Sequence, residues 1–149
     1  VDVIYTAILD GKEKDNLEKE MIKISEEYNL GLFKRDAGNV SDSSCLLLIG
    51  CSIKTNQLNP CGMCGFPNCD EKEKHPDVPC VFNSMDMGIA IGSAVSIAAD
   101  HRVDNRIMYT VGQAALNLKY FDEDVKVVCG IPLSAKGKNI FFDRKKKKK

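Results

Sequence analysis

The apolar stretch Cys45-Leu-Leu-Leu-Ile49, closed by Gly50, is the clearest fold signal in this sequence. A continuous apolar run of this length, bounded by turn-forming residues, is typical of a strand buried on both faces. Two other segments have a similar character, 1–10, which is rich in Val, Ile, Tyr and Thr, and 125–131. We therefore expect the first to be a central strand that ends at the Asp10-Gly11 turn, and the second to be the last strand.

The charged segment after the first strand predicts an amphipathic helix. Its apolar residues recur three or four positions apart, which places them on one stripe: Leu17, Met21, Ile24 and Tyr28. Gly31 would end this helix in a left-handed conformation. Beyond it, Leu32-Phe33 predicts a short strand, and the polar residues of 36–44 predict a loop.

Two more helices are expected after residue 80. The first would begin at Asn83 or Ser84 and run to about His101, and its Gly88 and Gly92 share one face. We expect these glycines to pack against the sheet or another helix, with close approach to a flat cofactor as the alternative. The second would be capped by Asp104 and carry an apolar core-facing stripe: Ile107, Met108, Val111, Ala115 and Leu118.

Size and charge bound the class of protein. The chain has 149 residues, of which 44% are hydrophobic and 28% charged, as in a soluble globular protein, and we expect one domain over 1–149. Five of its 21 basic residues form the run 145–149, a predicted basic tail, so the rest carries 16 basic and 21 acidic residues. This acidic body argues against a nucleic-acid partner. The longest mostly apolar run, 87–99, is shorter than the roughly 20 residues of a membrane span and predicts a buried helix.

The placement of the seven cysteines is the strongest functional signal. Three lie in apolar, strand-like stretches, where a thiol behaves as a small hydrophobic group: Cys45, Cys51 and Cys129. The other four lie within 52–80, a segment with four of the five prolines and few large apolar residues. We expect this segment to be an inserted loop that a bound metal holds together. The chain starts without a secretory signal pattern, so we expect a cytoplasmic protein with metal-ligating thiols rather than disulfides.

The spacing of the four thiols favours an iron–sulfur cluster. They follow the pattern C-x2-C-x4-C-x10-C: Cys61, Cys64, Cys69 and Cys80. Structural zinc sites usually contain two C-x2-C pairs, whereas an unequal spacing with a distant fourth cysteine is typical of clusters. Gly62 and Gly65 let the backbone turn tightly and point amide groups at sulfur. Zinc, with His75 as a substitute ligand, and free thiols remain open alternatives.

The segment Cys61-Gly-Met-Cys64-Gly-Phe-Pro-Asn-Cys69 resembles the cysteine motif of small four-iron ferredoxin-like modules. The chain also resembles, over nearly its whole length, an archaeal and bacterial family of uncharacterised ferredoxin-domain proteins. The segments that carry this resemblance, besides the cysteine motif, are 33–36, 48–50, 78–82, 88–93, 103–106, 130–134 and 137–144. The resemblance implies a 4Fe–4S cluster and names no reaction.

The order of the expected elements is similar to that of nitroreductase-like flavoproteins. This resemblance implies an α+β (α/β layered) fold, in which helices flank a mixed sheet, and a homodimer with its cofactor pocket between two subunits. It allows FMN as a second cofactor, with Lys138 and Arg144 as the phosphate contacts because both are cations that follow a glycine-rich turn. The Arg-rich motif that nitroreductases carry before their first strand has no counterpart in this sequence.

These observations favour a redox protein that passes single electrons from a cluster to a flavin or to a separate redox enzyme, without a membrane partner. The alternative is a non-enzymatic binding module whose four-cysteine loop is a structural zinc site. A flavoenzyme with a structural cysteine loop is a third hypothesis. Neither a Ser/His/Asp arrangement nor paired carboxylates can be located in the sequence, so hydrolase chemistry has no positive support.

Overall fold

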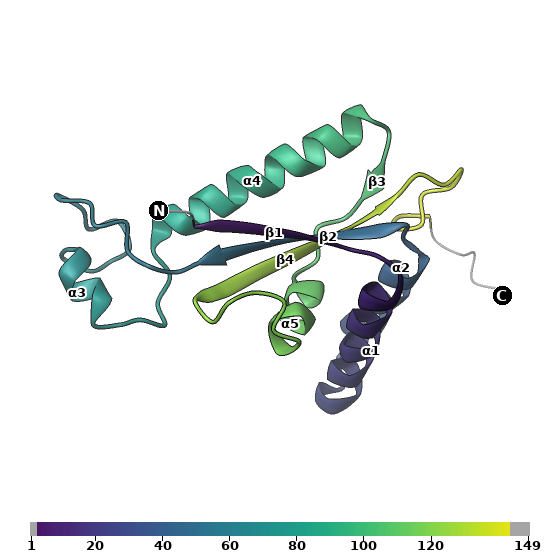
Figure 1. Cartoon of the computed structure of the whole chain (residues 1–149), viewed down its shortest axis with the longest axis horizontal. Helices are drawn as coiled ribbons and strands as arrows, with labels where there is room; N and C mark the ends of the chain where they lie inside the picture. The colour runs from purple at the N-terminus through teal and green to yellow at the C-terminus, as the bar shows by residue number, and fades with distance from the viewer. Residues whose placement is uncertain (1–2, 144–149) are drawn as a thin grey trace.

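The computed structural model describes residues 3–143 and has an α+β fold. Its sheet has the strand order β1-β2-β4-β3. The strands are β1 (Ile4–Leu9), β2 (Cys45–Ser52), β3 (Asp104–Asn105) and β4 (Val125–Ser134). Three helices cover one face: α1 (Gly11–Tyr28), α2 (Gly31–Asp42) and α5 (Tyr109–Asn117). The other face carries α4 (Val81–Asp100) alone, and a short helix, α3 (Cys69–Glu73), lies at one end of the molecule (Figure 1).

The predicted strands at 45–49 and 125–131 are confirmed, and each continues for three more residues. Two other expectations are wrong. The first strand is an edge strand, because within residues 3–143 β1 pairs with β2 alone, and its Ile8 is 73% exposed. The sheet is antiparallel at every pairing among the described residues, rather than mixed. The central strand is β2, whose Leu48 stands between Ala7 of β1 and Gly130 of β4.

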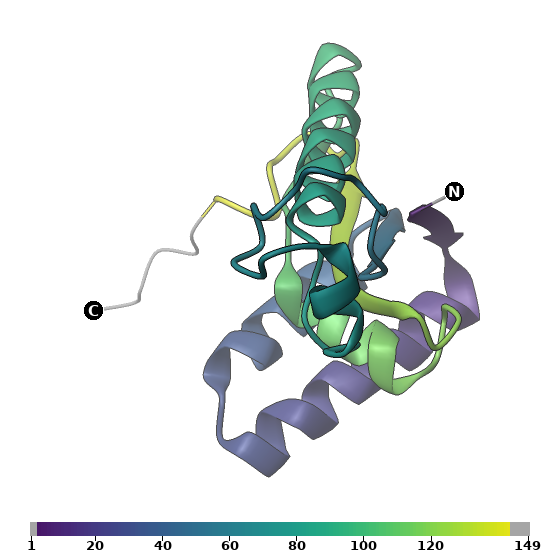
Figure 2. The same ribbon diagram turned by 90° about the vertical axis from the view of Figure 1, so that its left-hand side faces the viewer.

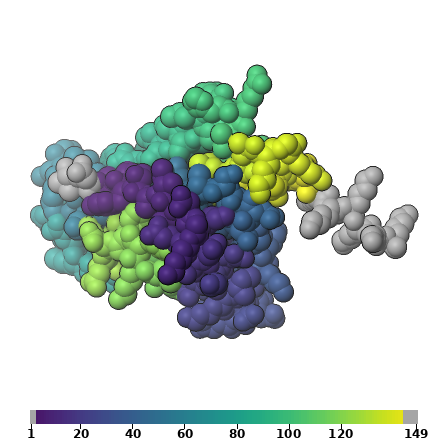
Figure 3. Space-filling model, turned by 45° about the vertical axis from the view of Figure 1, so that its right-hand side comes forward, coloured from purple at the N-terminus to yellow at the C-terminus, as the bar shows by residue number. Residues whose placement is uncertain are grey.

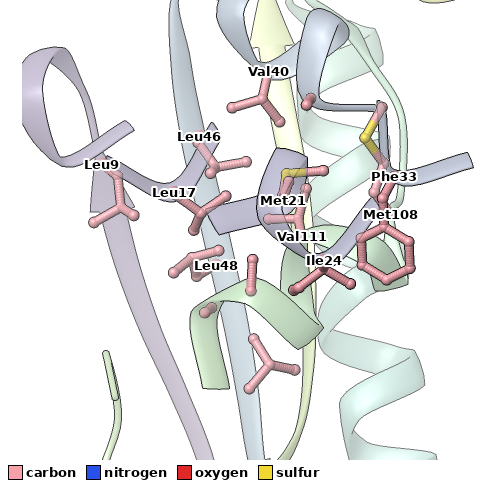
Figure 4. Packing of buried hydrophobic residues seen from close by; sticks show 14 of the residues in the cluster. Leu9, Leu17, Met21, Ile24, Phe33, Val40, Leu46, Leu48, Met108 and Val111 are labelled. Carbon is pink, nitrogen blue, oxygen red and sulfur yellow. The ribbon is translucent and has the colours of Figure 1, made fainter. Parts of the chain in front are cut away.

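The alternation of side chains along β2 divides the core between the two faces of the sheet. Leu46 and Leu48 lie in the larger cluster with α1, α2 and α5, whereas Ile49 and Cys51 lie in the smaller cluster under α4. Figure 4 shows the larger cluster, in which the predicted stripe residues of α1 meet β2, α2 and α5: Leu17, Met21 and Ile24. Tyr28, the fourth predicted member of that stripe, is 63% exposed.

The segment 31–42 is a helix where a strand and a loop were expected. Asn29, with φ 53°, ends α1 in the left-handed conformation assigned to Gly31, and Gly31 instead begins α2. Phe33, Ala37 and Val40 bury one face of α2 at helical spacing. The polar residues between these positions obscured the pattern in the sequence.

Asp104 does not cap a helix. It lies in β3 opposite Ser134, and its carboxylate accepts a hydrogen bond from the Asn139 amide at 3.0 Å. Helix α5 begins five residues later, and only part of the predicted stripe is buried: Met108, just before the helix, and Val111 and Ala115 within it. Ile107 and Leu118 are 48% and 38% exposed, so their assignment to the core is wrong.

Helix α4 is mostly exposed, which contradicts the expected buried helix. It begins at Val81 after Cys80, rather than at Asn83 or Ser84, and of its residues only Asn83 and Met87 are buried. Gly88 and Gly92 face open space, so their predicted packing does not occur within this chain. In length and hydropathy α4 qualifies as a membrane span, with 17% of its most apolar 18-residue window buried.

Candidate metal centre in the cysteine loop

The cysteine loop, residues 53–80, connects β2 to α4 and forms one end of the molecule, facing the viewer in Figure 2. Two buried polar side chains hold the start of this loop in place. Lys72 is only 3% exposed, and its ammonium group donates a hydrogen bond to the Ile53 carbonyl at 2.6 Å. The Asn83 amide donates to the carbonyls of Ser52 and Lys54 at 3.0 and 2.7 Å. The start of the loop is therefore tied both to Lys72, within the loop itself, and to Asn83 in the first turn of α4.

Polar and aromatic contacts organise the loop in place of an apolar core. The Asn68 side chain caps α3 by accepting from the Glu71 amide at 2.8 Å. The Phe66 and His75 rings stack with their centroids 4.9 Å apart. The Thr55 hydroxyl donates to the Glu73 carboxylate at 2.8 Å. Such exposed contacts contribute little stability each, so a bound ligand would add substantially to the stability of this loop.

The four predicted ligands occupy different local settings. Cys61 lies in irregular backbone, and Cys64 lies in a turn in which the Gly65 amide donates to the Gly62 carbonyl at 3.1 Å. Gly65, with φ +91°, has the positive φ that favours glycine. Cys69 is the first residue of α3, and its thiol donates to the Leu58 carbonyl at 3.4 Å. These three thiols are half-buried, whereas Cys80 is buried, and all four are free of disulfides.

The structure does not bring these four residues together. Over residues 3–143, no three His, Cys, Asp or Glu side chains lie close enough to hold a metal ion. The donor set nevertheless fits a soft metal or cluster, because all four groups are free thiols. Cys80 also stands at the N-cap of α4 without a side-chain cap bond, where unpaired amides favour a negative charge.

A buried polar group of side chains lies beside Cys80. The Cys51 thiol donates to the carbonyls of Ser52 and Asn83 at 3.0 and 3.1 Å. The Ser52 hydroxyl and the Asn83 amide oxygen are buried without a hydrogen-bond partner. Sequence analysis missed the anchoring roles of Lys72 and Asn83, and no local signal could reveal them, since each bond joins residues 19 or more positions apart.

Burial raises the pKa of the Cys51 thiol to about 11 from an ordinary 9.0, and the charges of Asp86 and Cys80 add to the rise. The free energy of unfolding should therefore be insensitive to this thiol below pH 9. Between pH 9 and 11 the unfolded chain loses a proton that the folded chain keeps, so stability falls as the pH rises.

The measurement is urea unfolding of wild type and Cys51→Ala at intervals from pH 8 to 11. The substitution should make the decline above pH 9 less steep, whatever it does to stability at pH 8. Equal slopes in the two proteins would contradict the assigned origin of the shift.

The two predicted FMN contacts are Lys138 and Arg144. Lys138 is exposed in the segment after β4, and Arg144 lies outside the described residues, as does the predicted tail at 145–149. A hollow of about 570 Å³ lies between the cysteine loop and the body. Its wall includes the ion pair of Lys54 and Asp124, at 2.7 Å. That hydrogen bond raises the pKa of Lys54 and lowers the pKa of Asp124.

Comparison with known proteins identifies the family. Residues 76–144 match the family model described as an uncharacterised protein containing a ferredoxin domain, DUF2148. An uncharacterised protein of Archaeoglobus fulgidus is 39% identical over 154 residues, which cover 99% of this chain and 82% of the archaeal protein. No solved structure matches, and the resemblance to nitroreductases is not supported. The chain thus belongs to the DUF2148 family of uncharacterised proteins that contain a ferredoxin domain.

Proposed function

We propose that this protein is an iron–sulfur electron carrier whose 4Fe–4S cluster is held by four thiolates of the cysteine loop: Cys61, Cys64, Cys69 and Cys80. The observation that carries the proposal is this C-x2-C-x4-C-x10-C array, which occurs in a member of a family described as containing a ferredoxin domain. Cys80 lies within the matched residues 76–144, whereas the other three precede them. The archaeal relative aligns over nearly the whole chain, including the loop.

The residues of the chain have distinct tasks in this proposal. Cys80 is the ligand on the body of the fold, because it is buried at the start of α4. Cys61, Cys64 and Cys69 lie on a loop with few apolar contacts, and they would have to move toward Cys80 to hold the group together with it. Lys72 and Asn83 both hold the start of that loop, through the carbonyls of residues 52–54. A bound cluster supplies reversible one-electron exchange, tuned by the hydrogen bonds and solvent exposure around it.

The position of the loop supports exchange with a second redox centre. Three of the four thiols are half-buried, so a group held there lies near the surface. The loop forms an end of the molecule that no other helix covers (Figure 2). We expect the electron partner to be a separate redox protein or a flavin in the cytoplasm, where thiols stay reduced.

The test is anaerobic purification of the full chain, followed by an absorbance spectrum and by quantification of iron, sulfide, zinc and flavin. The proposal predicts about four irons and four sulfides per chain and a broad visible absorbance that bleaches on reduction. One zinc per chain with no colour would overturn the proposal and leave a structural metal site. Stoichiometric FMN together with the cluster would identify the flavin as the partner.

A further inference from the structure

The cysteine loop buries one of its lysines. Most of this loop is exposed, in teal at the left-hand end of the molecule in Figure 3, yet Lys72 is 3% exposed and is the only buried residue of 54–79. Its ammonium group has three protons to donate and, within residues 3–143, one acceptor, the Ile53 carbonyl. The same group forms no salt bridge with any described residue. Lys72 therefore brings an unbalanced positive charge into the loop.

The carboxylates that line the hollow beside Lys72 do not pair with it. There are three of them: Glu73, Asp77 and Asp124. Glu73 accepts from the Thr55 hydroxyl at 2.8 Å. Asp124 pairs with Lys54 at 2.7 Å, and Asp77 is exposed. Because burying a charge is costly unless an opposite charge accompanies it, we expect a negative group beside Lys72 that these residues do not supply.

Lys72 lies one helical turn after Cys69, a ligand in the proposed function. Both belong to α3, and side chains three positions apart on a helix are neighbours, about 5–6 Å apart at Cβ. Because one helix carries both residues, this spacing does not depend on where the other thiols lie. Asn83 stands in the same relation to Cys80, three positions on, and it donates to the carbonyls on either side of Ile53. The two helices that begin at these cysteines are therefore tied to one segment of backbone.

We propose that Lys72 balances the negative charge of the group held in the cysteine loop and raises its reduction potential. This inference rests on the 4Fe–4S cluster of the proposed function. Four thiolates make the site negative, and reduction adds one further negative charge without forming or breaking a bond. A fixed ammonium charge near Cys69 attracts the more negative, reduced state more strongly, and burial limits the screening of that attraction by salt. Lys72 keeps its proton in both states and positions Cys69 through α3.

The measurement is the midpoint potential of the anaerobically purified full chain, from a titration of its visible absorbance with dithionite. Lys72→Gln keeps a hydrogen-bond donor at this position and removes the charge. It should lower the equilibrium constant for reduction at least tenfold, which is a fall of about 59 mV in the midpoint potential for one electron. Lys72→Arg keeps the charge, so its equilibrium constant should stay within about threefold of wild type.

Lys74→Gln is the matched control, because it removes the same charge at the end of the same helix. The Lys74 side chain is 69% exposed, and its ammonium already pairs with the Glu71 carboxylate at 2.7 Å. Solvent and that carboxylate screen its charge, so the equilibrium constant for reduction should change by less than about threefold. A fall as large as that of Lys72→Gln would overturn the proposal, since any nearby lysine would then have the same effect.

The iron content of each protein separates this proposal from the proposed function. Wild type without iron would overturn both, whereas loaded wild type with an unshifted potential in Lys72→Gln would overturn only the role of Lys72. If Lys72→Gln purifies without iron, Lys72→Arg decides the result. Full iron in Lys72→Arg would show that binding requires the charge, as proposed. Loss of iron from both variants would mean that the lysine acts only as an anchor for the Ile53 carbonyl, which would overturn the proposal.

Discussion

Cys80→Ala should reduce the iron content of the anaerobically purified protein from about four atoms per chain to a tenth of that or less, with loss of the visible absorbance. The expected effect is large because Cys80 is the one ligand candidate buried against the body of the protein, at the start of α4. The three candidates on the exposed part of the loop cannot complete a four-thiolate site without it. Iron and sulfide quantification on wild type and variant checks this result.

Cys129→Ala is the matched control for this experiment. Cys129 is a half-buried free thiol of β4, outside the cysteine loop, so its removal should leave the iron content unchanged. Full iron content in Cys80→Ala would contradict the proposed ligand set. If the variant instead binds one zinc that His75→Ala then abolishes, the loop is a three-cysteine, one-histidine zinc site.

Gly112→Ala should lower the free energy of unfolding by about 3 kcal/mol or more, at the upper end of the cost of overpacking. A Cβ atom at Gly112 would lie 1.7 Å from the Val128 carbonyl oxygen, which is backbone and cannot rotate away. Helix α5 therefore rests directly on β4, and the substitution must push the two apart. Urea unfolding followed by far-ultraviolet circular dichroism measures the loss.

Gly92→Ala makes the same chemical change in a helix where space is open. Since alanine favours a helix over glycine by about 1 kcal/mol, this control should be neutral or slightly stabilising in the single chain. Stability of Gly112→Ala within about 0.5 kcal/mol of wild type would show that α5 does not depend on this close contact.

The sequence by itself determined the elements whose side chains carry a local pattern. The apolar run at 45–49 specified a buried strand, and the spacing of Leu17, Met21 and Ile24 specified the buried face of α1. The four clustered cysteines predicted a candidate soft-metal loop, because the spacing of thiols is read from the sequence without a fold. These features depend on residues close together in the chain.

Only the tertiary structure decided where these elements lie and what they face. The apolar run of β1 cannot tell an edge strand from a central one, since that depends on which strands pair beside it. Asp36, which suggested a loop, is buried in α2 because its carboxylate accepts from Thr110, 74 residues away. The small residues of α4 predicted close packing, yet one helix on a wider sheet leaves its outer face exposed. Contacts between distant segments settle each of these questions, and a local sequence pattern does not contain them.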